Sequence, residues 1–428
     1  MLQGIEGATE VSKNAIEHTQ FCILVTFTEL VISPHLDHLD LASVPKILRL
    51  NYQTSQELSV LPVQDTQVEL IHFCDLSFSF RLNLYERLAE FQGLRSLVLG
   101  SGSGGWSNCY TEKFTSGLSR MKHLVKFSLC YDCTDAMVRK LATNCTATLK
   151  VLDVEMSKQV TDKSVPALCK LKLLHTLHIH HTGLTNEGQA KILIGLPRLQ
   201  LLVRGGFLCE ALQVLEDTEQ KLPELKLVEF WSSEEYFFHS DYQMILLSKV
   251  CPHLRKIMFQ FSTDVMTDLL VLATFPHLTD LHLWGGDFYV DKISTLVKKI
   301  GGQLTSLYLI HAEQVDKNAL ITIAKSCPHL TTLGFYNCEL VERDLEVTEE
   351  ELRRPWREEK MPEMVNLTTL ALVSDCPASL VALLLIASPN IQHLKTGIHC
   401  HLSDSLFINI FQKNQFPRLE TIHIPASK

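Results

Sequence analysis

The sequence predicts an α/β solenoid in which short parallel strands alternate with helices, and three observations carry this prediction. One phrase is written three times between Pro276 and Cys338, as PHLTDLHLWGG, GQLTSLYLIHA and PHLTTLGFYNC. Its first leucines, Leu278, Leu304 and Leu330, stand 26 residues apart in both intervals (304 − 278 and 330 − 304). Serine, threonine or aspartate side chains suited to capping a helix follow several such phrases. A repeat of this length predicts one strand and one helix per coil.

The L-x-x-L-x-L pattern of this phrase recurs along most of the chain, which identifies it as a leucine-rich repeat. Its first positions are Leu94, Leu124, Leu149, Leu174, Leu199, Leu225, Leu254, Leu278, Leu304, Leu330, Leu367, Ile391 and Leu419. Because every coil runs the same way, adjacent strands must be parallel. We therefore expect a leucine-rich repeat horseshoe, with a parallel sheet on the concave face, helices on the convex face, and the leucines pointing into the core.

Coil length and composition divide the chain further. Residues 1–35 lack the phrase and are expected to form a helical N-terminal cap, while residues 36–428 carry the repeats, weakly at first. The coil that begins at Leu330 is 37 residues long (367 − 330), and its surplus lies in residues 342–360, which hold eight acids and five bases. We expect this charged insertion to project into solvent, and a docking arm or a loop controlled by phosphorylation is the alternative.

Charge and composition narrow the classes of partner. Proteins that bind nucleic acid usually carry an excess of lysine and arginine, whereas this chain has a net charge of −9. Nucleic acid is therefore not an expected partner. The 13 scattered cysteines are typical of reduced thiols that pack in a protein of the cytoplasm or nucleus. The longest apolar run near the start, Phe21–Ile32, is too short to span a bilayer, and acidic residues precede it, so neither a membrane anchor nor a secretory signal is expected.

Candidate chemical motifs are weak. Two clusters invite a metal site, namely His178, His180 and His181, and His399, Cys400 and His401. Zinc sites require four ligands and supporting hydrogen bonds, so we interpret both clusters as polar groove residues. The pair Cys130 and Cys133 lacks a second pair at zinc spacing, and no Lys-Ser/Thr follows the glycines of residues 100–105. We expect a non-catalytic protein with no metal and no cofactor.

Two coils open with Cys-Pro-His-Leu, at Cys251–Leu254 and Cys327–Leu330, and Val160–Asp162 forms a Val-Thr-Asp turn. The second opening continues through Leu333 and Phe335 to a further cysteine, Cys338, and these motifs resemble the cysteine-containing leucine-rich repeats of F-box proteins. In that family the repeats hold a protein substrate for ubiquitination, while an N-terminal F-box binds the ligase adaptor.

The resemblance covers roughly Val68 to the C-terminus, and residues 1–60 contain no recognisable F-box opening. It implies substrate recognition within an SCF-type ubiquitin ligase assembly, with ligase subunits as partners. The alternative is a leucine-rich repeat scaffold or signalling adaptor unrelated to ubiquitin.

Strand alternation predicts which side chains line the concave groove. Counted from the first leucine of each coil, the fifth and seventh positions face it. In the middle of the chain these positions are Glu229, Trp231, Met258, Gln260, His282, Trp284, Tyr308, Ile310 and Tyr336. Tryptophan, tyrosine and methionine are enriched at interface centres, so we predict that this stripe binds a protein or peptide. The seventh positions Trp231, Trp284 and Tyr336 are expected to face solvent, and packing of the aromatics on one another is the alternative.

Overall fold

The computed structural model describes residues 38–40, 94–99, 111–203, 208–218, 222–231, 239–261, 267–342, 361–397 and 404–423. The chain divides into two compact units, Met1–Leu215 and Glu216–Lys428. Several predicted features lie outside the described residues. They are the helical cap at 1–35, the glycines of 100–105, residues 343–360 of the charged insertion and the cluster from His399 to His401.

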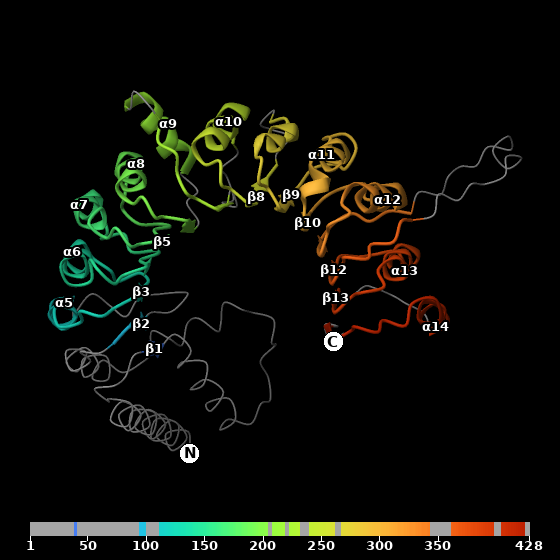
Figure 1. Cartoon of the computed structure of the whole chain (residues 1–428), viewed down its shortest axis with the longest axis horizontal. Helices are drawn as coiled ribbons and strands as arrows, with labels where there is room; N and C mark the ends of the chain where they lie inside the picture. Colours follow the sequence, from blue (N-terminus) through green and yellow to red (C-terminus); the bar gives the residue numbers. More distant parts are fainter. Residues whose placement is uncertain are drawn as a thin grey trace, which may run out of the picture. The chain divides into compact units, whose positions relative to one another are not determined.

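Within the described part of the first unit, six strands form one parallel sheet whose order follows the chain. The strands are β1 (His38–Asp40), β2 (Ser96–Leu99), β3 (Lys126–Leu129), β4 (Val151–Asp153), β5 (Thr176–His178) and β6 (Leu201–Val203). The helices between them are α5 (Thr111–Leu118), α6 (Asp135–Asn144), the short 3-10 helix η4 (Asp162–Ser164), α7 (Val165–Leu168) and α8 (Asn186–Gly195). Figure 1 shows these helices on one side of the sheet. Helix α9 (Leu208–Thr218) contains the boundary between the units.

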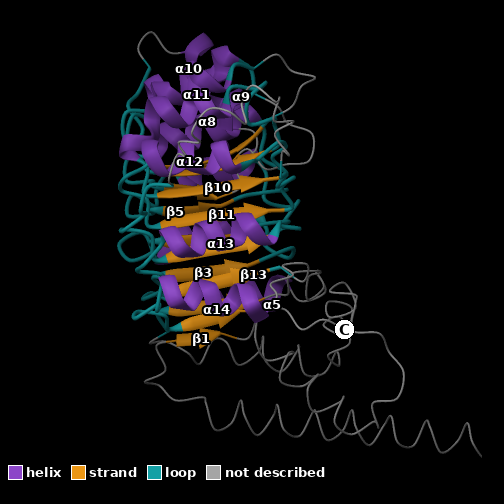
Figure 2. Cartoon of the chain, turned by 90° about the vertical axis from the view of Figure 1, so that its right-hand side faces the viewer, coloured by secondary structure: helices purple, strands orange, loops and turns teal. Residues whose placement is uncertain are grey.

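The described part of the second unit repeats this arrangement with an eight-stranded parallel sheet, again in chain order. Its strands are β7 (Glu229–Trp231), β8 (Lys256–Gln260), β9 (Asp280–Trp284), β10 (Ser306–Ile310), β11 (Thr332–Tyr336), β12 (Thr369–Val373), β13 (His393–Thr396) and β14 (Thr421–His423). Its helices are α10 (Asp241–Val250), η5 (Leu269–Thr274), α11 (Ile293–Ile300), η6 (Gly301–Gln303), α12 (Lys317–Ser326), α13 (Ala378–Ala387) and α14 (Asp404–Lys413). Figure 2 shows the strands of each sheet running in one direction. The fold is the predicted α/β leucine-rich repeat solenoid.

The core of each coil lies between the sheet and its helix and is built from the leucines of the phrase. In the β9 coil, Leu278 and Leu283 have no exposed surface and Leu281 has 1%. Burial alternates along β9, so the residues between these leucines turn to the opposite face. The predicted inward direction of the leucines is therefore confirmed.

Threonine and aspartate side chains start the helices and also tie neighbouring coils together. Thr134 caps α6, and its side chain accepts a hydrogen bond from the backbone N–H of Met137. The next residue, Asp135, accepts hydrogen bonds from the backbone N–H and the hydroxyl of Thr161, both at 2.8 Å. Asp162 repeats this contact with Thr185, at 2.9 and 2.7 Å. Each aspartate thus fixes where the helix of the following coil begins.

Cysteines end several of these helices. Cys145, Cys251 and Cys327 occupy the C-cap positions of α6, α10 and α12, and the backbone N–H of each bonds back into its helix. All three side chains are buried, which confirms the predicted packing role for these thiols. No helix in the described ranges combines the length and apolar character needed to cross a bilayer.

Candidate functional site

The face of the second sheet that points away from the buried leucines carries two rows of side chains, which we call the groove face. Strand register places Trp231, Met258, His282 and Tyr308 side by side in the first row, one from each of β7 to β10. The second row contains Gln260, Trp284, Ile310 and Tyr336, one from each of β8 to β11. With Glu229 on β7, the groove face includes all nine residues predicted from the sequence.

The structure corrects one register prediction. Trp231 was expected in the row of Gln260 and Trp284, but it pairs with Met258, and Glu229 pairs with Lys256. The phrase of this coil starts at Leu227, two residues later than expected. Side chains alternate with a period of two, so this shift moves Trp231 along its strand and leaves it on the same face.

None of the nine side chains is fully buried, and their exposure is uneven. Trp284 is the most open of the large ones, with 37% of its surface exposed, as predicted. Trp231 and Tyr336 were also expected to face solvent, but both are half-buried. Contacts with neighbouring side chains on the same face account for this difference.

Aromatic rings contact one another across three strands of the groove face. The ring of His282 lies 4.4 Å from that of Tyr308, and Tyr308 lies 5.9 Å from Tyr336, measured between centroids. Gly334 makes this possible, because a Cβ atom at that position would lie 2.3 Å from Cδ1 of Tyr308. Tyr308 therefore leans across β11 and joins the two rows.

Lysines flank the aromatic rings at two places. The Nζ atom of Lys256 lies 5.0 Å from the ring centroid of Trp231, and that of Lys395 lies 5.4 Å from the ring of Tyr336. Such cation–π contacts hold both partners in place. The indole Nε1 of Trp231 also donates a hydrogen bond to Oε2 of Glu229, at 3.2 Å. The aromatic centre is thus bordered by charged groups, as in many protein interfaces.

The centre of the groove face is uncharged near neutral pH. Burial lowers the pKa of His282 to about 4, assisted by the nearby charge of Lys256 and opposed by Asp280. Burial also raises the pKa of Tyr308 and of Tyr336, so both hydroxyls keep their protons. A ligand at neutral pH would meet neutral aromatic rings there.

Trp284 is the last residue of strand β9. Its ring stacks on His311, with centroids 5.5 Å apart and planes at 25°. The next residues, Gly285 and Gly286, have φ values of 85° and 96°, which side chains rarely tolerate. In the loop that follows, Val290 is 78% exposed. Sequence reasoning based on strand positions missed this apolar residue, because it lies beyond the repeated phrase.

Of the histidines predicted as polar groove residues, His178 ends β5 in the first unit, and His180 and His181 lie in the turn that follows. His180 and His181 contact each other with ring centroids 3.8 Å apart. His178 pairs instead with Glu155 of the preceding coil, at 3.4 Å from Nδ1 to Oε1. Cys130 lies nearby, and burial together with the charge of Asp153 raises the pKa of its thiol to about 12. A protonated thiol is a poor nucleophile, so Cys130 is not suited to covalent catalysis.

No protein-family model matches the sequence, and no curated protein matches it. Solved structures similar to this chain include the yeast Rad7–Elc1 complex, with a TM-score of 0.42, 15% identity, and coverage of 98% of this chain and 91% of that chain. A leucine-rich repeat protein of Leptospira interrogans has a TM-score of 0.37 and 14% identity over 80% of this chain and 74% of that one. The mouse RP105/MD-1 complex has a TM-score of 0.41 and 14% identity over 80% and 65%. At these TM-scores the likeness carries no argument about function.

Proposed function

We propose that the chain is a non-catalytic binding module whose groove face holds a protein or peptide ligand, with Trp284 as the central anchor. The observation that carries this proposal is the row of aromatic and apolar side chains on the strand side of β7 to β11, in which the rings of His282, Tyr308 and Tyr336 contact one another. Four strand steps separate Trp231 from Tyr336, which at about 4.8 Å per step corresponds to about 19 Å. A surface of this length accommodates an extended peptide or the edge of a folded domain.

Packing among the rings does not account for all of the aromatic surface. An indole that only covered backbone would be buried, yet Trp284 keeps more than a third of its surface exposed. Exposed apolar surface of this kind, with a polar border, is typical of interaction sites. Contacts such as that between Trp284 and His311 also hold the rings in place before a ligand arrives. Less conformational entropy is then lost on binding.

Within this proposal, substrate recognition in an SCF-type ubiquitin ligase assembly is the first assignment, and the sequence resemblance to F-box repeat proteins supports it. The second is a scaffold or signalling adaptor without a ubiquitin connection. The residues that carry the resemblance stabilise the repeats of this chain, since Cys251 and Cys327 end helices and Thr161 starts one. They do not by themselves indicate a ubiquitin ligase. The assignment therefore depends on the bound partner.

Affinity capture from cell extract tests the groove face. Trp284→Ala is expected to weaken capture of the partner by about thirtyfold, since truncating an interface anchor costs about 2 kcal/mol and each decade of affinity corresponds to about 1.4 kcal/mol. The control is Tyr242→Ala, which removes an aromatic side chain that is 54% exposed on helix α10. Every captured protein is quantified by mass spectrometry.

The control variant should retain its partners. If Trp284→Ala loses no partner, or if both variants lose the same ones, the groove face is not the binding surface. Ligase subunits recovered with the wild-type chain would favour the ubiquitin assignment, and a partner set without them would favour the scaffold.

A further inference from the structure

Three side chains with metal-binding atoms meet on the strand face of the first unit, and a thiol lies beside one of them. Strand register places Ser128, Asp153 and His178 side by side on β3, β4 and β5. Cys130 lies two residues after Ser128, and Glu155 lies two residues after Asp153. Side chains alternate between the two faces, so both stay on the same face as the residues they follow. Imidazole, carboxylate and thiol groups are thereby gathered from three successive coils.

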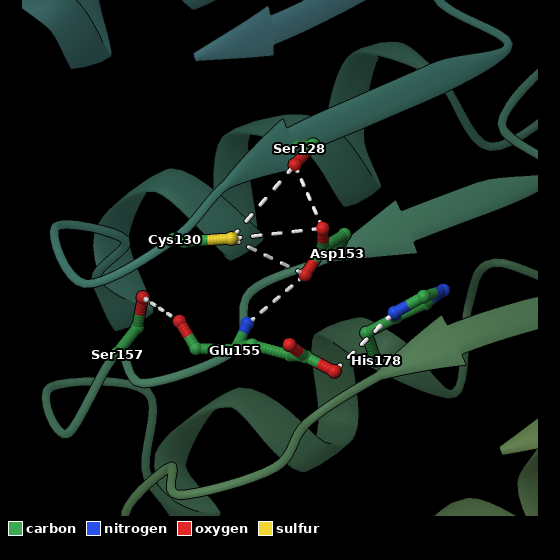
Figure 3. Close-up of polar contacts among 6 residues, drawn as sticks. All are labelled: Ser128, Cys130, Asp153, Glu155, Ser157 and His178. Atoms are coloured by element: carbon green, nitrogen blue, oxygen red, sulfur yellow. Dashed lines mark hydrogen bonds and ion pairs between the residues drawn. The ribbon is translucent and has the colours of Figure 1, made fainter. Parts of the chain in front are cut away.

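The distances among Asp153, Glu155 and His178 suit a single small cation, and Cys130 lies against one of the three. One ligand atom from each of Asp153, Glu155 and His178 lies within 4.8 Å of the others, and all three residues are half-buried. The Sγ atom of Cys130 lies 3.6 Å from both carboxylate oxygens of Asp153. Figure 3 shows the carboxylate of Glu155 reaching toward His178, and the carboxylate of Asp153 between them and Cys130.

Hydrogen bonds from the Ser128 hydroxyl and the Glu155 backbone orient Asp153. The hydroxyl of Ser128 donates to its Oδ2 at 2.8 Å, and the backbone N–H of Glu155 approaches its Oδ1 at 3.2 Å. The hydroxyl of Ser157 contacts the backbone carbonyl of Glu155 at 3.4 Å. Metal-binding carboxylates commonly receive such supporting hydrogen bonds, which fix their direction before the ion arrives.

We propose that Asp153, Glu155 and His178 bind a divalent transition-metal ion of the Zn²⁺ type, with Cys130 supplying a fourth ligand. An imidazole nitrogen and a thiolate sulfur favour such an ion, whereas Mg²⁺ and Ca²⁺ prefer oxygen ligands alone. The ion offsets the two carboxylate charges, and the thiol loses its proton on coordination. This site revises the sequence-based expectation of no metal, and it lies in a different unit from the groove face.

Calorimetric titration with Zn²⁺ tests this site in the full chain after treatment with a chelator. His178→Ala is expected to weaken binding at one site by at least about a hundredfold, because losing even a residue that supports a ligand costs about 10- to 100-fold. His253→Ala is the matched control, since its Nε2 lies 2.9 Å from Glu224 in an exposed pair elsewhere in the chain. Thermal unfolding without metal checks that each variant is folded.

Two further variants separate the ligands. Glu155→Gln keeps the size of the side chain and should weaken Zn²⁺ binding as His178→Ala does. Cys130→Ser should abolish the sulfur-to-metal absorption of the chain loaded with Co²⁺. Zn²⁺ binding that is equal in the wild type, His178→Ala and Glu155→Gln would overturn the site. An unchanged Co²⁺ spectrum in Cys130→Ser would show that Cys130 is not a ligand of the metal.

Discussion

Leu283→Ala is expected to lower the free energy of unfolding by about 2–5 kcal/mol, because it leaves a cavity in the core. Leu283 has no exposed surface, while the next residue along β9, Trp284, is 37% exposed. Trp284→Ala should therefore cost less, about 1 kcal/mol, which corresponds to its stacking on His311. Denaturation with guanidinium chloride, followed by circular dichroism, measures both values.

The next coil offers the same comparison. Leu309 has no exposed surface, whereas Ile310 is half-buried on the groove face. Leu309→Ala should again be the more destabilising of the two alanine substitutions. Equal losses at Leu283 and Trp284 would place both side chains in the core and contradict the alternation on which the groove face depends.

Acid should destabilise the second unit through His239. This side chain is 1% exposed, and its burial lowers its pKa from 6.5 to about 4, opposed by the nearby side chain of Gln243. Between these two pH values the unfolded chain binds a proton that the folded chain does not. Stability is therefore complete above about pH 6.5 and falls as the pH drops toward 4. The total loss is about 3 kcal/mol, at about 1.4 kcal/mol per pKa unit.

A variant that cannot ionise isolates this contribution. His239→Phe keeps an aromatic ring beside Phe230, whose ring lies 5.4 Å from that of His239. Its free energy of unfolding should fall less than that of the wild type between pH 6.5 and 4. His282 also has a lowered pKa and remains in both proteins, so its effect cancels in the comparison. Identical pH profiles would show that His239 does not titrate as its burial implies.

The period of the phrase made the solenoid predictable, because a spacing near 26 residues and an alternation of two are both visible in the sequence. The register of β7 could not be predicted, because Leu225 and Leu227 both fit the first position of the phrase. The later choice gives the more even intervals of 28 (227 − 199) and 27 (254 − 227) residues. Pairing of Glu229 with Lys256 settles the choice, since it aligns Leu227 with Leu254.

The two sites differ in how far the sequence could reveal them. All nine groove residues were predictable because each coil repeats the same positions. The lean of Tyr308 over Gly334 was not, because it depends on ring orientation across two strands. The cluster of Asp153 and His178 is indicated in the sequence only by the equal spacing of positions 128, 153 and 178, which are 25 residues apart (153 − 128 and 178 − 153). Finding it required comparing neighbouring coils, whereas the histidines were first considered within one.

An aromatic photo-crosslinking amino acid, which keeps a ring in place of the indole of Trp284, tests most directly whether the groove face holds the partner. The same group at position 242, on the exposed side of α10, provides the comparison. Illumination in cell extract, followed by mass spectrometry, identifies the attached proteins. Attachment of the captured partner from position 284 and not from 242 is the result that we predict. Attachment from position 242 alone, or equally from both, would contradict the groove face as the binding surface.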